Sequence, residues 1–270
     1  MLNMVKRKIK NTLIVLISIY VMIAASLYFL QDKILFRPTV LAQDYVYAFN
    51  YNFEELFLKP EEEVVINALH FKGENPKGVI LYFHGNAGDL SRWGLITEYF
   101  VKKQYDVFVM DYRTFGKSTG ALSEEALYKD AQFCYNYVKA QYREDQITVY
   151  GRSLGTGIAT FTASKNQPKQ LVLETPYFNI QDVAKHRFPI FPVKYLMNYR
   201  LPTNEFIARV TCPISILHGT DDMVVPFTSG KKLYDVAPKT HKSFVRIEEG
   251  SHNNLITYDA YHKHINKVLP

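Results

Sequence analysis

The chain has 270 residues, with 32 Lys and Arg against 26 Asp and Glu, which gives a formal net charge of +6. Hydrophobic residues make up 47% of it, and it holds only 13 Gly and 12 Pro, so a disordered or collagen-like chain is excluded. Only one uncharged stretch is long enough to cross a bilayer, which excludes a multi-span membrane protein. Four basic residues lie between Lys6 and Lys10, and no Lys/Arg cluster follows, so we expect no nucleic-acid partner.

The first candidate element is the uncharged run Asn11–Gln31. As a helix that rises about 1.5 Å per residue, it would be roughly 31 Å long, about one hydrocarbon core. A cleaved signal peptide is the alternative, but its small-residue site, Ala24-Ala25-Ser26, lies inside the run, and the apolar Leu27–Leu30 follows. We therefore expect an uncleaved anchor at residues 11–31, behind a basic cytoplasmic N-terminus at residues 1–10. The positive-inside rule then places the rest of the chain on the exported side of the membrane.

After a membrane-proximal connector at residues 32–60, apolar runs rich in β-branched residues alternate with amphipathic helical patterns. Such alternation predicts an α/β fold with a mainly parallel central sheet and helices on both faces, here over residues 61–270. The expected strands are Val64–Leu69, Val79–Phe83, Val107–Met110, Ile147–Tyr150, Leu171–Leu173, Ile214–Leu217 and Phe244–Ile247. The expected helices are Leu95–Lys103, Ser123–Tyr142, Gly157–Ala163, Lys231–Val236 and Leu255–Val268.

Residues 176–206 interrupt this alternation with four prolines and a run of aromatic and basic residues. A long insertion between core strands is commonly a lid or a binding element, and the alternative is a set of surface helices that pack on the core. If the segment is a lid, its apolar residues can bury an acyl chain while its charges face water or anionic head groups. We expect Phe191 and Leu196 to contact such a chain.

The sequence Gly151-Arg152-Ser153-Leu154-Gly155 lies between an expected strand and an expected helix. This is the G-x-S-x-G pattern of a nucleophile elbow in its required strand–turn–helix context. The two glycines leave space for a tight turn that raises the serine hydroxyl at the helix N-terminus, where partial positive charge favours an oxyanion. Ser153 is therefore the candidate nucleophile.

A serine hydroxyl needs a base, and the base needs an acid that orients it. In this structural context the order along the chain is Ser, then acid, then His. One expected strand is followed by Asp221 and Asp222, and the next by His252. We predict that Ser153, His252 and Asp222 form a catalytic triad, and that Asp221 is an exposed turn residue.

Acyl transfer also needs backbone N–H donors aimed at the developing oxyanion. We assign one to Leu154, the residue after the nucleophile. The other is Asn86 in the loop His84-Gly85-Asn86-Ala87-Gly88, whose glycines let the backbone approach a substrate. No G-x-G-x-x-G or H-E-x-x-H motif is present, and the two cysteines have no metal-type spacing, so we expect no cofactor and no metal.

A resemblance to the α/β-hydrolase superfamily is carried by His84-Gly85-Asn86-Ala87-Gly88, Asp111-Tyr112-Arg113-Thr114-Phe115-Gly116-Lys117-Ser118, Gly151-Arg152-Ser153-Leu154-Gly155, His218-Gly219-Thr220-Asp221-Asp222 and Gly250-Ser251-His252. More closely, the chain resembles single-span, membrane-anchored hydrolases of the bud-emergence type. These are similar to the eukaryotic α/β-hydrolase domain proteins that include acyl-protein thioesterases. The resemblance runs from about Gln31 to the C-terminus and implies Ser153 as nucleophile, Asp222 as acid and His252 as base. One departure is Thr114, where the family usually has Gly.

These observations favour a membrane-anchored serine hydrolase that cleaves an ester or thioester of a small-molecule or lipid-acyl substrate through an acyl-enzyme. A serine peptidase of the aminopeptidase or prolyl-oligopeptidase type is an alternative, although the chain has no room for a propeller domain. A non-catalytic, membrane-bound interaction protein is a third reading, and the intact Ser, Asp and His count against it. Substrates vary across the family, so the resemblance supports a reaction type rather than one substrate. The sequence predicts no particular oligomeric state.

Overall fold

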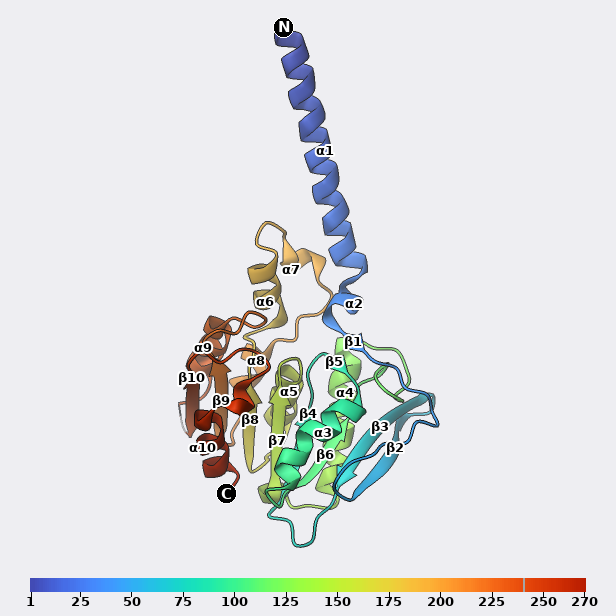
Figure 1. Cartoon of the computed structure of the whole chain (residues 1–270), viewed down its shortest axis with the longest axis vertical. Helices are drawn as coiled ribbons and strands as arrows, with labels where there is room; N and C mark the ends of the chain where they lie inside the picture. Colours follow the sequence, from blue (N-terminus) through green and yellow to red (C-terminus); the bar gives the residue numbers. More distant parts are fainter. Residues whose placement is uncertain (240) are drawn as a thin grey trace.

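The computed structural model describes residues 1–239 and 241–270. A long N-terminal helix projects from a layered α/β domain (Figure 1). This helix, α1 (Leu2–Phe29), has no buried residue and is long and apolar enough to cross a membrane. It includes the basic residues at the N-terminus and ends two residues before the expected boundary at Gln31. A short helix, α2 (Gln31–Leu35), follows, and then the two-residue strand β1 (Arg37–Pro38).

The centre of the domain is an eight-stranded sheet. In spatial order its strands are β10 (Lys242–Ile247), β9 (Ile214–Gly219), β8 (Gln170–Glu174), β7 (Ile147–Arg152), β4 (Val79–Phe83), β6 (Asp106–Met110), β3 (Val64–Phe71) and β2 (Phe53–Glu61). Strand β3 runs antiparallel to both of its neighbours, and the other pairings described in this sheet are parallel. The expected α/β fold with a mainly parallel sheet is therefore confirmed.

Helices cover both faces of the sheet, each over its own apolar cluster (Figure 1). One face is covered by α3 (Leu90–Val101) and α10 (Asp259–Val268). The other is covered by α4 (Glu124–Lys139), α5 (Gly155–Lys165), α8 (Thr203–Ile207) and α9 (Phe227–Val236). Because both faces are covered, all five residues of the central strand β4 are buried, and its sequence is apolar throughout. Two 3₁₀ turns, η1 (Glu144–Gln146) and η2 (Leu255–Thr257), complete the domain.

The structure differs from the sequence-based boundaries in two places. Strand β2 begins within residues 32–60, the segment expected to be a connector, so the sheet starts at Phe53 rather than after residue 60. Its charged residues and Pro60 hide the strand pattern, and they are tolerated because β2 is the edge strand. The closing helix expected at Leu255–Val268 is divided into η2 and α10. Asn254 begins a separate turn, in which its carbonyl accepts hydrogen bonds from the N–H and the hydroxyl of Thr257.

The lid segment, residues 176–206, divides into two parts. Helix α8 at its end packs on the core, as the alternative reading proposed. Helices α6 (Ile180–Arg187) and α7 (Val193–Leu196) instead lie beside the end of α1 and above the carboxyl edge of the sheet (Figure 1). This is the edge at which β7, β9 and β10 deliver the expected site residues.

Candidate active site

Ser153 lies at a sharp turn between β7 and α5. Its φ angle is +51°, a left-handed conformation that non-glycine residues rarely adopt and that is typical of strained functional sites. The flanking glycines are required for space. A Cβ atom on Gly151 would lie 2.7 Å from Cβ of Ala159, and one on Gly155 would overlap the carbonyl oxygen of Phe83. The elbow therefore has the geometry that its sequence predicts.

The structure brings together the three residues expected to form a triad. Nε2 of His252 is 2.9 Å from Oγ of Ser153, and Nδ1 of His252 is 2.8 Å from Oδ2 of Asp222. An ionised carboxylate can only accept a hydrogen bond, so Nδ1–H of His252 donates to Asp222. The neutral imidazole then presents the Nε2 lone pair to the serine hydroxyl, which is the arrangement that proton removal requires.

Asp222 is held as a carboxylate by its surroundings. Its Oδ1 accepts from the backbone N–H groups of Val224 and Val225 at 2.9 and 2.8 Å. Burial acts to raise the pKa of Asp222, but hydrogen bonds from His218, His252 and Val225 outweigh it and hold this pKa below its ordinary value. The carboxyl is thus ionised at neutral pH.

The neighbouring Asp221 is exposed, as expected of a turn residue. Its backbone N–H donates to the carbonyl of Gly250, and its carboxylate accepts from the hydroxyl of Thr220. Of the two aspartates, only Asp222 contacts His252. This geometry agrees with the choice of Asp222 over Asp221 that the sequence favoured.

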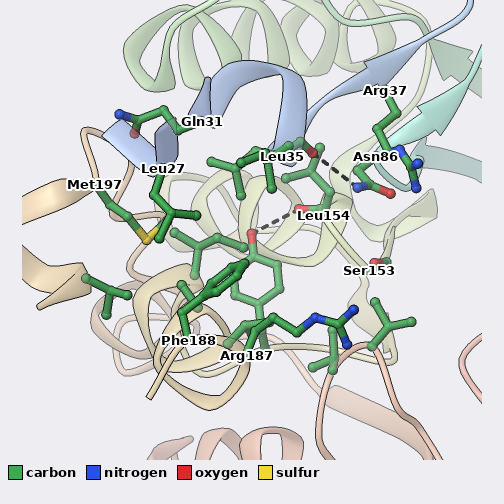
Figure 2. Close-up of a pocket in the computed structure, with 18 of the residues that line it drawn as sticks. Leu27, Gln31, Leu35, Arg37, Asn86, Ser153, Leu154, Arg187, Phe188 and Met197 are labelled. Atoms are coloured by element: carbon green, nitrogen blue, oxygen red, sulfur yellow. Dashed lines mark hydrogen bonds between the residues drawn. The ribbon is translucent and has the colours of Figure 1, made fainter. Parts of the chain in front are cut away.

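The two residues expected to supply the oxyanion donors lie near Ser153. Leu154 and Asn86 both line the same cavity as Ser153, and within the described residues neither backbone N–H has a hydrogen-bond acceptor. The loop of Asn86 approaches the elbow closely, since a Cβ on Gly85 would lie 3.7 Å from Cβ of Ser153. Figure 2 shows Asn86, Leu154 and Ser153 around one end of the cavity.

Two other buried histidines at strand ends stabilise these loops. Nδ1 of His84 contacts the carbonyl of Gly85 at 2.7 Å, and its Nε2 lies 3.2 Å from Oδ1 of Asp111. Nε2 of His218 lies 3.0 Å from the carbonyl of Val225, in the turn that carries Asp222. Both imidazoles hold loop backbone in place.

The cavity at Ser153 has a volume of about 370 Å³ and is mostly apolar. Its lining includes Leu196, as the sequence predicts, together with Phe188, Val193 and Met197 of the lid segment. Phe191, the other residue expected to contact an acyl chain, is not among the residues that line the cavity. It stacks on Tyr20 of α1 with centroids 4.8 Å apart and planes 9° apart.

The sequence reasoning missed several lining residues. They include Leu27, Gln31, Ile34, Leu35 and Arg37 from the N-terminal segment, Arg187 from α6, and Met223, Val224 and Val225 from the turn after β9. No local motif marks them, because their place in the cavity depends on packing between distant segments. Within the described residues, no group of three or more His, Cys, Asp and Glu side chains is placed to hold a metal ion. Cys134 and Cys212 are free and buried.

The chain is similar in sequence to several known proteins. Residues 74–205 match the family described as "Serine aminopeptidase, S33". The chain is 33% identical over 226 residues to the lysophosphatidylserine lipase ABHD12 of Danio rerio, covering 68% of this chain and 58% of that protein. It is 30% identical over 236 residues to the uncharacterized protein R595 of Acanthamoeba polyphaga mimivirus, covering 78% and 79%. The match to the lipases thus spans between a half and two thirds of their length.

Solved structures share the fold. A Pyrococcus furiosus esterase superposes with a TM-score of 0.68 at 14% identity, covering 87% of this chain and 96% of its own. A Paleococcus ferrophilus monoacylglycerol lipase gives 0.59 at 15% identity, covering 76% and 98%. The protein is an α/β hydrolase by its fold. By its sequence relatives it belongs to the α/β-hydrolase superfamily, in which it is similar to the lysophosphatidylserine lipases named above.

Proposed function

We propose that the protein is a membrane-anchored serine hydrolase that cleaves an ester or thioester of a lipophilic acyl group. The observation that carries this proposal is the relay from Ser153 through His252 to Asp222, with contacts of 2.9 and 2.8 Å, at one end of an apolar cavity. A relay of this geometry activates a serine, and an apolar cavity beside it can hold an acyl chain.

The reaction proceeds in two steps. His252 removes the proton of Ser153 as Oγ attacks the acyl carbon, and the N–H groups of Leu154 and Asn86 stabilise the oxyanion. His252 then gives this proton to the leaving alcohol or thiol, and the acyl group stays on Ser153. His252 then takes a proton from a water molecule as its oxygen attacks the acyl carbon, and returns that proton to Oγ of Ser153 as the bond between Oγ and the acyl carbon breaks and the fatty acid leaves. Asp222 fixes the tautomer of His252 and stabilises the imidazolium that forms in each step.

The substrate class we propose is a single-chain lipid ester with an anionic head group. Arg37 and Arg187 line the cavity, and neither forms an ion pair with a described carboxylate. In Figure 2 both lie at the end of the cavity that holds Ser153. Guanidinium groups pair well with phosphate and carboxylate. The name of the ABHD12 relatives, lysophosphatidylserine lipase, supports the same class.

An aminopeptidase is the second candidate, because the matching family carries that name. A peptide N-terminus is a cation and needs a carboxylate partner, yet none of the residues described as lining the cavity is Asp or Glu. The two arginines repel a cation instead. The electrostatics of the site therefore favour the ester reaction.

For the membrane arrangement, we propose that residues 11–31 anchor the chain, with residues 1–10 in the cytoplasm and the hydrolase domain on the exported side. The apolar α1 and the basic residues before it support this arrangement. Within the domain, residues 176–206 act as a lid over the cavity, since α6 and α7 supply much of its wall.

The experiment is fluorophosphonate labelling of the full-length protein, followed by hydrolysis of a lysophosphatidylserine, an uncharged monoacylglycerol and an aminoacyl p-nitroanilide. We expect labelling that is lost in Ser153→Ala, and a preference for the anionic ester. Arg187→Gln lowers this preference, whereas Lys185→Gln, an exposed lysine of α6 outside the cavity, leaves it unchanged. Faster cleavage of the anilide than of either ester contradicts the proposal.

A further inference from the structure

The end of the anchor helix forms part of the wall of the cavity that holds Ser153. Leu27 of α1 and Gln31, Ile34 and Leu35 of α2 all line it. In Figure 2, Leu27 and Gln31 lie with Met197 of the lid segment at the end away from Ser153. An acyl chain that extends from the nucleophile into the cavity therefore runs toward the anchor.

Gln31 joins the anchor to the lid segment by specific hydrogen bonds. The side chain is only 5% exposed. Its Nε2 donates to the carbonyls of Tyr28 at 2.7 Å and Leu196 at 3.4 Å, and its Oε1 accepts from the backbone N–H of Asn198 at 2.7 Å. A buried amide with three partners holds the two segments at a defined separation.

A second contact lies about three turns earlier along α1. Tyr20 stacks on Phe191 of the lid segment, and its hydroxyl donates to the carbonyl of Ile190 at 3.2 Å. Ile190 itself is 72% exposed, beside a helix whose own apolar residues are exposed along its length. This part of the lid segment therefore lies at the level of the helix that we assign to the bilayer.

The segment after the anchor is also attached to the oxyanion loop. The Nδ2 group of Asn86 donates to the carbonyl of Leu35 at 3.1 Å, and the N–H of Arg37 donates to the carbonyl of Asn86 at 2.8 Å. Strand β1 then pairs with β5 (Ala87–Gly88). The backbone that carries one proposed oxyanion donor is thus fixed by the chain that leaves the membrane.

From these contacts we infer that the anchor is a substrate-binding element as well as an attachment. Its last turn and α2 hold the distal part of a long acyl chain, which enters between α1 and the lid segment directly from the bilayer. This inference rests on the proposed function and adds the source and path of the substrate. Leu27 and Gln31 line the distal end of the cavity where α1 leaves the proposed bilayer, so the chain of a membrane-resident, single-chain ester would pass from lipid to protein without crossing water.

The test fills the distal end of the cavity in the full-length protein in lipid vesicles. Leu27→Trp and Ile34→Trp place a large ring in the wall, and Leu30→Trp is the matched control, because Leu30 is exposed and does not line the cavity. The readout is the ratio of kcat/KM for a dodecanoyl ester to that for a butanoyl ester. We expect each wall variant to lower this ratio by about tenfold or more, since several buried CH₂ groups lose their place. The control keeps the wild-type ratio.

The outcomes are distinguishable from failure of the proposed function. If the protein neither labels with fluorophosphonate nor cleaves the butanoyl ester, the proposed function fails. If it labels and cleaves, but both wall variants keep the wild-type ratio, the anchor does not bind the acyl chain and this inference is overturned. The inference is also overturned if both wall variants still label with fluorophosphonate but lose kcat/KM equally for the two esters. A ring that fills the distal end of the cavity must slow the dodecanoyl ester more than the butanoyl ester. If Leu27→Trp fails to fold, Ile34→Trp still provides the test, because Ile34 is 45% exposed and a larger side chain there should leave the fold intact.

Discussion

Nε2 of His252 lies 2.9 Å from Oγ of Ser153, although 99 residues separate them in the chain. The two residues belong to different loops, one after β7 and one after β10, at the same edge of a parallel sheet. Parallel strands end together, so residues that follow them converge at one edge. Asp222 arrives from the loop after β9 and completes the relay at 2.8 Å from His252.

Substitutions test which residues belong to the catalytic relay, because only those should lower kcat strongly. We expect Ser153→Ala and His252→Ala each to lower kcat by about 10⁴-fold or more, with little change in thermal unfolding. Asp222→Asn is nearly as damaging because the amide no longer selects the Nδ1–H tautomer of His252. Asp221→Asn is the matched control, and its exposed side chain predicts less than a twofold effect. A reversed order for the two aspartates would falsify the assignment of the acid.

Arg152, inside the elbow motif, forms a buried ion pair with Glu174, with Nε 3.2 Å from Oε1. Tyr150 also donates to this carboxylate at 2.6 Å. Arg152→Met leaves a buried carboxylate without its cation, so we expect a loss of about 3–5 kcal/mol in the free energy of unfolding. The double variant Arg152→Met with Glu174→Gln removes both charges and recovers most of that loss. Denaturant titration of the wild type, the single variant and the double variant measures these differences in the free energy of unfolding. Equal stability of the single and double variants would contradict the prediction.

His70 gives the domain a defined dependence on pH. Burial, with a smaller contribution from Lys72, lowers the pKa of His70 to about 4. In the unfolded chain the pKa is about 6.5, so between these values the unfolded state binds a proton that the folded state does not. The free energy of unfolding therefore falls as the pH drops from about 6.5 to 4, by up to about 1.4 kcal/mol per pH unit from this group.

The variant that removes this effect is His70→Phe. The ring can keep its edge contact with Phe108, and the hydroxyl of Tyr142 still donates to Asp106. We expect similar stability to wild type at pH 7.5 and a clear gain at pH 5, measured by urea unfolding. His264, whose pKa burial also lowers, leaves a residual slope in the variant. Identical pH profiles for the two proteins count against a neutral buried His70.

Most of the strands and the relay could be predicted from sequence because their signals are local. The buried parallel strands are rich in apolar and β-branched residues, and Ser153, Asp222 and His252 lie in the loops that follow β7, β9 and β10. Thr114, where the family usually has Gly, shows a conformation that its side chain does not favour. Its φ angle is +74°, a conformation that suits the glycine the family usually has there.

The cavity could not be predicted in the same way. Gln31 contacts residues 165 and 167 positions away, and no periodicity in either segment indicates that contact. Phe191 shows the consequence. Its apolar side chain would suit an acyl site, yet the ring stacks on Tyr20 of α1 instead. Which apolar residue of a lid faces the cavity depends on what the rest of the chain places against it.

The last prediction concerns how activity depends on acyl length. Each CH₂ buried in the cavity contributes ~0.8 kcal/mol, about a three- to fourfold rise in kcat/KM while the chain still fits. We therefore expect activity on p-nitrophenyl esters to increase from acetate to at least hexanoate. Leu196→Ser places a hydroxyl in the apolar wall and flattens this increase more than it lowers acetate hydrolysis. Tyr195→Ser is the matched control on α7, because that side chain is 81% exposed and outside the cavity. A preference that peaks at acetate and falls steadily would show that the acyl chain does not enter the space between the lid segment and the anchor.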